Sequence, residues 1–327
     1  MNFGQPDSYK KAAEQACRIY HLKSPMAISL LYVSENATFL LKRISDNLPC
    51  KVMRVARIGY RTAEEIQAEI KWLEHLGQQN KIKTPVLVRN EAGGFLTMAE
   101  ADGQTYACLL FEYLRGVHPD LSDGQKACED FYQVGQTAAM LHLDAAGWKE
   151  SRNLARPHWD YDHMIGEGGL FGNWRQCEKL SSDDRLLLEQ ACGRIRHRLS
   201  LYGRDEENYG LIHSDLRAAN LLKENGRIQV IDFDDCGFGW HMYDLAASLS
   251  FVEDHPWAGQ WAKAWLKGYE TVRPLRKADL AEIPTFIMAR RIQLLAWVTS
   301  HEDSDPVGRL RGGFAENTVK LARYYMK

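Results

Sequence analysis

Aspartate and asparagine side chains recur at short spacing in the run LIHSDLRAANLLKENGRIQVIDFDD, positions 211–235. Asn220 and Asp232 offer hard oxygen ligands of the kind that suits Mg²⁺, which takes one or two protein groups and completes its shell with water and phosphate oxygens. Asp215 adds a carboxylate that can orient a hydroxyl nucleophile and accept its proton. Arg217 can neutralise the charge of a phosphoryl group in transfer. These residues together indicate metal-assisted phosphoryl transfer to an alcohol.

A predicted β-hairpin would bring these groups together. The dipeptide Asn225-Gly226 favours the positive φ angles of a two-residue type I′ turn, and strand-like runs flank it on both sides. Such a turn pairs position 224 with position 227, so counting outward puts Asn220 opposite position 231. We therefore expect the Asn220 side chain and the Asp232 carboxylate to meet at the open end of the hairpin. The loop that carries Asp215 enters the same end.

The same residues resemble a known catalytic sequence. Positions 213–220, HSDLRAAN, are similar to the kinase catalytic loop H-R-D-L-x-x-x-N, and positions 231–233, IDF, stand in the place of the metal-binding D-F-G without its glycine. With YDLA at positions 243–246, the chain resembles the aminoglycoside phosphotransferase and choline kinase superfamily, which includes type II homoserine kinases and bacterial stress-response Ser/Thr kinases. The resemblance implies a bilobal protein-kinase-like fold, ATP and Mg²⁺ as cofactors, and Asp215 as the catalytic base.

Other residues of this block have supporting or open roles. Asp234 is either a second metal contact or a solvated carboxylate, and Asp235 is interpreted as solvated. His213 is expected to make structural hydrogen bonds, since proton acceptance falls to the neighbouring aspartate. Asp244 is expected to hold the catalytic loop in place. Ser214 stands where many relatives have glycine, which removes no group that the chemistry needs.

A strongly helical segment is predicted after Thr62, which forms a capping-box pattern with Glu65. Glu69 lies about 40° from the centre of the apolar stripe of this helix, at ~100° per residue. A carboxylate buried there needs a cation, because an unpaired buried charge costs several kcal/mol, and Arg54 in the preceding strand-like run is the candidate. The pair matches the strand lysine and helix glutamate that position ATP phosphates in kinases, with arginine replacing lysine. An ordinary structural ion pair is the alternative.

The resemblance implies nucleotide-binding roles for two further segments. Ser34 and Asn36 lie in a turn between two strand-like runs, where the family covers the nucleotide phosphates. Glu112 and Leu114 occupy the place of the hinge whose backbone pairs with adenine. The implied organisation is a nucleotide-binding lobe at 1–112, a hinge at 113–117, and a helical lobe with the catalytic loop and the acceptor site at 118–327.

The apolar pattern favours an α+β fold. From about Ala27 to Leu114 the chain consists of short β-type runs and the single helix after Thr62, and from about Asp123 onward it is mostly helical. We expect a small antiparallel sheet with one helix, followed by a larger helical part. The run from Arg152 to Trp174, rich in glycine, aromatics and histidine, is predicted to be an irregular surface segment, either packed or facing the substrate.

Acceptor-binding residues are expected in the helical part. Aromatic rings with a few charged groups suit a small polar ligand, although ordinary helix packing has the same composition, and they occur at Arg156–Trp174, Arg290, Arg291, Trp297, His301, Glu302 and Asp303. If these segments form the pocket, substitution of Trp159 or Arg291 raises KM for the acceptor. The expected acceptor is a small hydroxylated metabolite. A Ser/Thr protein kinase and a nucleotide-binding module without turnover are the alternatives.

The composition limits the kinds of partner molecule and the cellular compartment that the sequence predicts. The 41 basic and 43 acidic residues give a formal net charge of -2, so no global field attracts nucleic acid or an anionic membrane. The sequence has neither a signal-peptide pattern nor an apolar stretch long enough for a bilayer, and its seven cysteines show no metal or redox spacing. We expect a cytoplasmic protein with reduced thiols. The identity of the acceptor and the oligomeric state are not indicated.

Overall fold

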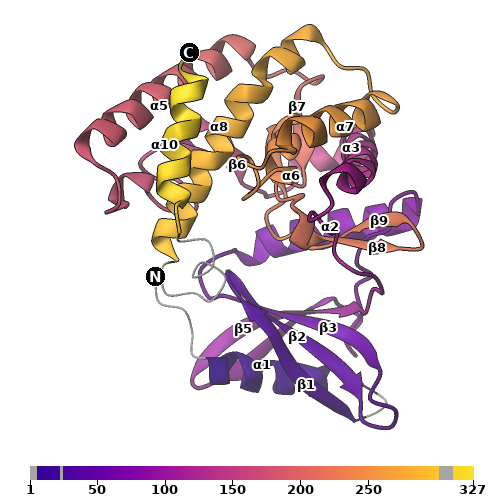
Figure 1. Cartoon of the computed structure of the whole chain (residues 1–327). Helices are drawn as coiled ribbons and strands as arrows, with labels where there is room; N and C mark the ends of the chain where they lie inside the picture. Colours follow the sequence, from indigo (N-terminus) through magenta and orange to yellow (C-terminus); the bar gives the residue numbers. More distant parts are fainter. Residues whose placement is uncertain (1–5, 23–24, 302–311) are drawn as a thin grey trace. The chain divides into compact units, whose positions relative to one another are not determined.

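The computed structural model describes residues 6–22, 25–301 and 312–327 (Figure 1). Its tertiary contacts divide the chain into two compact units, residues 1–116 and 117–327, here called the N-terminal unit and the C-terminal unit. The boundary lies within residues 113–117, the segment that the sequence predicts as a hinge.

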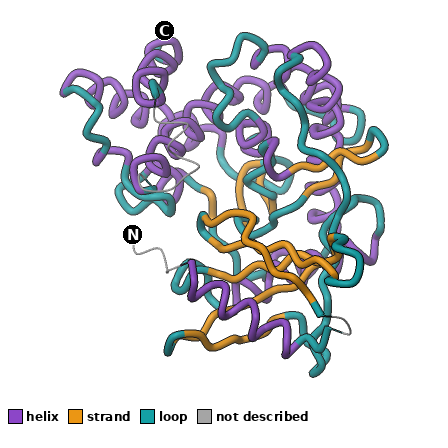
Figure 2. The backbone as a smooth tube through the Cα atoms, turned by 60° about the horizontal axis from the view of Figure 1, so that its bottom comes forward, coloured by secondary structure: helices purple, strands orange, loops and turns teal. Residues whose placement is uncertain are grey.

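The N-terminal unit is built on a five-stranded antiparallel sheet (Figure 2). Its strands follow the order β1-β2-β3-β5-β4, and each predicted β-type run forms one of them. Phe39, Met53 and Leu110 are buried in the core that this sheet shares with a covering helix. The prediction of a small antiparallel sheet is confirmed by the strands β1 (Met26–Val33), β2 (Asn36–Arg43), β3 (Pro49–Ala56), β4 (Leu96–Ala101) and β5 (Gln104–Glu112).

Helix α2 (Ala63–Gln79) is the helix predicted after Thr62. The Glu65 N–H donates to the Thr62 hydroxyl at 3.2 Å, and the Thr62 N–H donates to the Glu65 carboxylate at 2.8 Å, so the capping box is present. Glu69 is only 1% exposed. It lies in the buried stripe formed by Ile66, Ile70, Leu73 and Leu76.

One helix is predicted for this unit, but a second, α1 (Pro6–Ile19), packs against the sheet (Figure 1). The rings of Tyr9 and Tyr106 meet edge to face at 5.5 Å between centroids, and the Tyr20 hydroxyl donates to the Phe95 carbonyl at 2.5 Å. Most of the buried face of α1 consists of alanine, namely Ala12, Ala13 and Ala16. The amphipathic pattern of α1 is present in the sequence, so this helix could have been predicted from it.

The C-terminal unit is mostly helical, as predicted. Gly135 of α3 and Gly268 of α7 allow these two helices to pack closely, because a Cβ on either would lie 1.9 Å from a backbone oxygen of the other helix. Phe131, Val134, Ala138 and Leu141 form a buried apolar face on α3. The helices are α3 (Gly124–Gly147), α4 (Tyr161–Ile165), α5 (Ser182–Tyr202), α6 (Tyr243–Ser248), α7 (Ala258–Glu270), α8 (Lys277–Ser300) and α10 (Phe314–Tyr325).

The predicted hairpin is present. It consists of β8 (Leu221–Glu224) and β9 (Arg227–Val230), with Glu224 paired to Arg227. The turn residues Asn225 and Gly226 have φ of 50° and 77°, the left-handed values that a type I′ turn requires. The Ile231 N–H donates to the Asn220 carbonyl at 2.9 Å, which confirms the predicted register at the open end.

A small three-stranded sheet carries the chain into the catalytic loop. In it, β10 (Gly237–Trp240) lies parallel to β6 (His158–Trp159) and antiparallel to β7 (Tyr209–Ile212).

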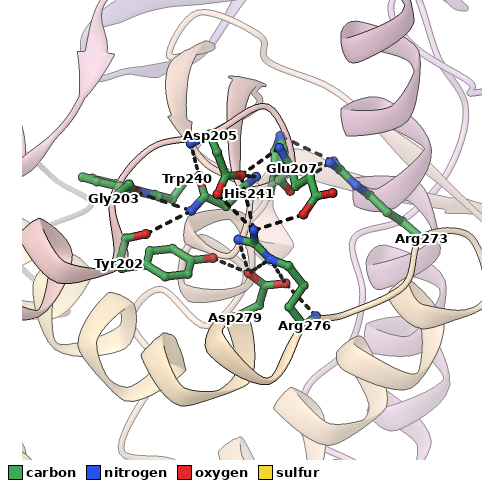
Figure 3. Close-up of polar contacts among 10 residues, drawn as sticks. Tyr202, Gly203, Asp205, Glu207, Trp240, His241, Arg273, Arg276 and Asp279 are labelled. Atoms are coloured by element: carbon green, nitrogen blue, oxygen red, sulfur yellow. Dashed lines mark hydrogen bonds and ion pairs between the residues drawn. The ribbon is translucent and has the colours of Figure 1, made fainter.

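A cluster of polar contacts precedes β7 (Figure 3). Within it, Arg276 donates to Asp205 at 3.0 Å and to Asp279 at 2.9 Å, and the Tyr202 hydroxyl donates to Asp279 at 2.5 Å. These contacts join the end of α5, the segment before β7 and the start of α8.

Residues 152–174 contain only short elements, namely part of η1 (Lys149–Asn153), β6, α4 and the start of η2 (Trp174–Gln176). Arg152, His158 and Leu170 are exposed, as expected of a surface segment. Trp159 and Trp174 are at most 1% exposed, so these two rings are packed and do not face a substrate.

In the part of the chain that the structure describes, no helix combines the length and apolar character needed to cross a membrane. The seven cysteines all lie among the described residues, and none of them forms a disulfide bond.

Candidate active site

The loop after β7 carries Asp215 and is fixed from behind by Asp244 of α6. The Asp244 carboxylate accepts the N–H of His213 at 3.2 Å and the N–H of Ser214 at 2.7 Å, which confirms its predicted role. Ser214 has φ of 67°, in the left-handed region, which explains why glycine is suitable at this position. Its hydroxyl donates to the Asp235 carbonyl at 2.5 Å, a bond that glycine would lack.

Two buried histidines complete this support. Burial raises the pKa of Asp244 to about 6, and burial lowers the pKa of His142 of α3 well below its ordinary value. His142 is therefore neutral; its Nε2–H donates to Asp244 at 2.9 Å and its Nδ1 accepts the Tyr269 hydroxyl at 3.0 Å. His213 accepts the Asp215 N–H on Nδ1 at 3.3 Å and lies 3.2 Å from the Ile231 carbonyl through Nε2, the structural role that was predicted.

Three side chains hold the carboxylate of Asp215, which is only 9% exposed. Its Oδ1 accepts from Arg290 of α8 at 2.5 Å, while its Oδ2 accepts from Arg217 Nε at 3.0 Å and from Asn220 Nδ2 at 2.5 Å. Burial alone would raise the pKa of Asp215, but the charges of Arg217 and Arg290 outweigh it and keep this pKa below its ordinary value. Asp215 is therefore an oriented, ionised carboxylate at neutral pH.

Arg217 differs from the other partners of Asp215 in its exposure. About a third of its side chain is accessible (35%), and within the described residues only its Nε makes a hydrogen bond. The terminal nitrogens of its guanidinium are thus available to an anionic ligand. Burial lowers the pKa of Arg217, but the carboxylates of Asp215 and, to a smaller extent, Asp232 outweigh burial and raise this pKa above its ordinary value.

The donor set at the hairpin fits a hard divalent cation. The Asn220 amide nitrogen faces two acceptors, the carbonyl of Asp215 at 3.0 Å and its carboxylate, so the orientation of this amide is determined. Its Oδ1 accepts no hydrogen bond from the described residues. Asp232 follows Ile231, whose N–H binds the Asn220 carbonyl, and has φ of 63°. An amide oxygen and a carboxylate are ligands that Mg²⁺ accepts.

Asp234 and Asp235 follow the hairpin on a segment held by its backbone. Arg156 donates to the carbonyl of Asp234, and the Trp159 indole N–H donates to the carbonyl of Asp235 at 2.8 Å. Asp234 is only 5% exposed. A role of Asp234 as a second metal contact stays a prediction.

In the N-terminal unit, Arg54 of β3 and Glu69 of α2 form the expected ion pair. The two guanidinium nitrogens of Arg54 bind the two carboxylate oxygens at 2.9 and 2.5 Å. Arg54 is 7% and Glu69 is 1% exposed, and the guanidinium lies 5.8 Å from the centroid of the Phe111 ring. This bidentate geometry orients the arginine, as the lysine–glutamate pair of kinases orients its lysine.

We expect Arg54→Met and Glu69→Gln to be strongly non-additive. Each single substitution removes one partner of a buried ion pair, which costs about 3–5 kcal/mol of unfolding free energy, whereas the double variant removes both charges. Denaturant unfolding and kcat/KM for ATP, measured on all four proteins, give the coupling. The exposed pair Arg89–Glu74 is the control, where effects of at most about 1 kcal/mol are expected. Additive effects on kcat/KM would leave Arg54 and Glu69 as an ordinary structural pair.

The other predicted nucleotide contacts occupy strand ends of the N-terminal unit. Ser34 lies in the turn between β1 and β2, where its N–H donates to the Asn36 carbonyl at 3.0 Å. The Asn36 side chain accepts the Arg57 N–H at 3.2 Å, so it has a structural partner. Glu112 ends β5 and pairs with Lys51 at 2.6 Å, and the N–H of Leu114 makes no hydrogen bond within the described residues. The pairing of the Glu112 and Leu114 backbone with adenine stays a prediction.

The predicted acceptor residues are not all placed as expected. Trp159 and Arg291 are 1% and 2% exposed, and Arg291 binds Glu253 at 2.7 Å and Thr318 at 2.9 Å. Packing and ion pairing occupy both side chains, so for these two residues the structure favours ordinary helix packing, the alternative to an acceptor pocket. Glu302 and Asp303 lie outside the described residues.

Sequence reasoning missed two contacts at the site. The Arg290–Asp215 pair joins residues 75 positions apart, and the His142–Asp244 pair joins residues 102 positions apart. Neither pair has a local spacing pattern. The only available signal for Arg290 is a charge within a helix whose neighbours are apolar, which implies a buried partner without identifying it.

The fold and the site together define a protein-kinase-like phosphotransferase. The sequence profile described as "Phosphotransferase enzyme family" matches residues 33–277. The chain therefore belongs to the phosphotransferase enzyme family, as the sequence resemblance implied. It is a kinase of this family.

Individual relatives agree with this assignment. A solved structure of a microcompartment-associated aminopropanol kinase is 33% identical, covers 96% of each chain and superimposes with a TM-score of 0.86. Amicoumacin kinase of Bacillus subtilis (strain 168) is 21% identical over 85% of this chain and 82% of its own length. Homoserine kinase of Caulobacter vibrioides is 26% identical over 89% of this chain and 87% of its own length. These likenesses confirm the α+β protein-kinase-like fold.

Proposed function

We propose that this kinase transfers the γ-phosphate of Mg-ATP to the hydroxyl group of a small amino alcohol, with Asp215 as the catalytic base. The observation that carries the proposal is the Asp215 carboxylate, held ionised and oriented by Arg217, Asn220 and Arg290. A solved amicoumacin kinase complex with an ATP analogue supports a nucleotide donor for the family. The aminopropanol and homoserine kinases among the relatives act on short molecules that carry both an amino and a hydroxyl group.

In this proposal the acceptor hydroxyl donates a hydrogen bond to Asp215. Its oxygen forms a bond to the γ-phosphorus, the bond from that phosphorus to the bridging oxygen of ADP breaks, and the hydroxyl proton passes to Asp215. Arg217 stabilises the charge on the transferred group through its accessible nitrogens. The depressed pKa of Asp215 fits this role, because a loose transition state demands little basicity until the new bond has formed.

Asn220 and Asp232 would hold Mg²⁺, with Asp234 as a candidate second contact. The ion would supply charge neutralisation for the phosphate oxygens. In the N-terminal unit, Arg54 would bind phosphate while Glu69 orients it. The turn at Ser34 and Asn36 would lie against the phosphates, and the backbone at Glu112 and Leu114 would pair with adenine.

The test is a coupled ADP assay with matched acceptors, followed by mass spectrometry of the products. We expect turnover with amino alcohols such as aminopropanol, ethanolamine or homoserine. Each is compared with the same alcohol lacking the amino group, for which a lower kcat/KM is expected. Phosphorylation of protein Ser or Thr with no active small molecule would favour the stress-response type of kinase. ATP binding without turnover on any acceptor would favour a binding module.

A further inference from the structure

Arg290 lies at the centre of a buried polar network on α8. It is 2% exposed, and its guanidinium donates to Ser250 at 2.9 Å, to Tyr243 at 3.1 Å, to Gln293 at 3.2 Å and to Asp215 at 2.5 Å. All three of its nitrogens are used by the protein. Unlike Arg217, it therefore has little capacity to bind a substrate directly.

Arg290 binds the oxygen of the Asp215 carboxylate that the loop residues Arg217 and Asn220 do not bind. Arg217 and Asn220 lie in the same loop as Asp215 and both bind its Oδ2, so they move with it. Arg290 binds the other oxygen, Oδ1, from a 24-residue helix. Donors on both oxygens fix the plane of the carboxylate. Among the described residues, Arg290 alone ties that plane to a long helix outside the loop.

We propose that Arg290 is a positioning residue that sets the orientation of Asp215 for phosphoryl transfer. The inference rests on the proposed role of Asp215 as the base. A misplacement of about 1 Å at a reacting group can lower the rate about 100-fold. Without Arg290, Asp215 would still be a carboxylate, but it would be poorly oriented and the rate of transfer would fall. Substrate affinity should change little, because all three nitrogens of Arg290 are bonded to protein groups.

Arg291 provides a matched control on the same helix. It is equally buried, at 2% exposed, and it pairs with Glu253 and Thr318 instead of with the catalytic loop. Arg290→Met and Arg291→Met each leave a buried carboxylate without its arginine, so both variants should lose stability. Only Arg290→Met should lower kcat disproportionately, by about 10–100-fold, with KM for ATP and for the acceptor nearly unchanged.

A second comparison separates positioning from general damage. In the Asp215→Asn background, Arg290→Met should cause no further loss of kcat, because the carboxylate through which it acts is gone. Arg290→Lys, which keeps a cation within reach of Oδ1, should recover part of the activity of Arg290→Met. If Arg290→Met does not fold, Arg290→Lys is carried through the same comparison. Melting temperatures of all variants accompany the kinetics.

Two results would overturn the proposal. One is an equal loss of kcat in Arg290→Met and Arg291→Met that follows their loss of stability. The other is a loss from Arg290→Met that is as large in the Asp215→Asn background as in the parent. Either result leaves Asp215 as the base, whereas full activity of Asp215→Asn alone would remove the proposed function itself.

Discussion

Asp215→Asn should lower kcat for acceptor phosphorylation by about 10²–10⁴-fold, the usual contribution of a general base. Asparagine keeps the size of the side chain but neither accepts the hydroxyl proton nor carries the charge that orients it. The dissociation constant for Mg-ATP should stay close to that of the parent, since Asp215 acts on the acceptor. Product formation measured at fixed time points gives kcat, and calorimetric titration with Mg-ATP gives the dissociation constant.

The control for Asp215→Asn is Asp279→Asn. Asp279 is also buried, at 6% exposed, and is paired with Arg276 and with the Tyr202 hydroxyl in the cluster of Figure 3. Its loss should lower the melting temperature without a selective effect on kcat. Similar transfer rates for Asp215→Asn and the parent would exclude Asp215 as the base, whatever the acceptor.

Asp232→Asn should raise the Mg²⁺ concentration needed for half-maximal rate by more than about tenfold. Substituting a residue that only supports a metal ligand typically lowers metal affinity about 10–100-fold, and Asp232 is proposed to be a ligand itself. Asn220→Ala should raise it less, since a neutral ligand is lost in place of a charged one. Asn220→Ala should however lower kcat at saturating Mg²⁺, because the Asn220 amide also holds Asp215 at 2.5 Å.

Titration of Mg²⁺ against initial rate, at fixed saturating ATP, distinguishes these effects. Asp279→Asn again serves as the control and should keep the Mg²⁺ dependence of the parent. The opposite order, with Asn220→Ala more dependent on Mg²⁺ than Asp232→Asn, would reject the ligand assignment. Removal of divalent cations with EDTA should stop turnover in every protein.

Local patterns predicted much of this site. The type I′ turn at Asn225-Gly226 determines its own strand pairing, so the register that brings Asn220 opposite Ile231 could be counted from the sequence. The capping box at Thr62 fixes the start of α2, and helical periodicity then places Glu69 in the buried stripe. These features depend on residues a few positions apart, which is why they could be predicted.

Contacts between distant elements could not be predicted in the same way. Arg290 and Arg291 are adjacent and equally charged, yet one binds Asp215 and the other binds Glu253. Their partners depend on how α8 packs in three dimensions, which no local spacing records. The burial of Trp159 has the same origin, since an aromatic ring in an irregular segment suits either a core or a pocket.

The adjacent arginines of α8 limit how the length of this chain can vary in evolution. Successive helical residues differ by ~100° in direction, so inserting or deleting one residue upstream within α8 would turn both guanidiniums away from their partners together. Single substitutions at exposed positions of α8 leave both arginines in place, whereas an inserted or deleted residue displaces both of them. Insertions and deletions that adapt such an enzyme to new acceptors are therefore expected to accumulate in the connecting segments and not within α8 ahead of Arg290.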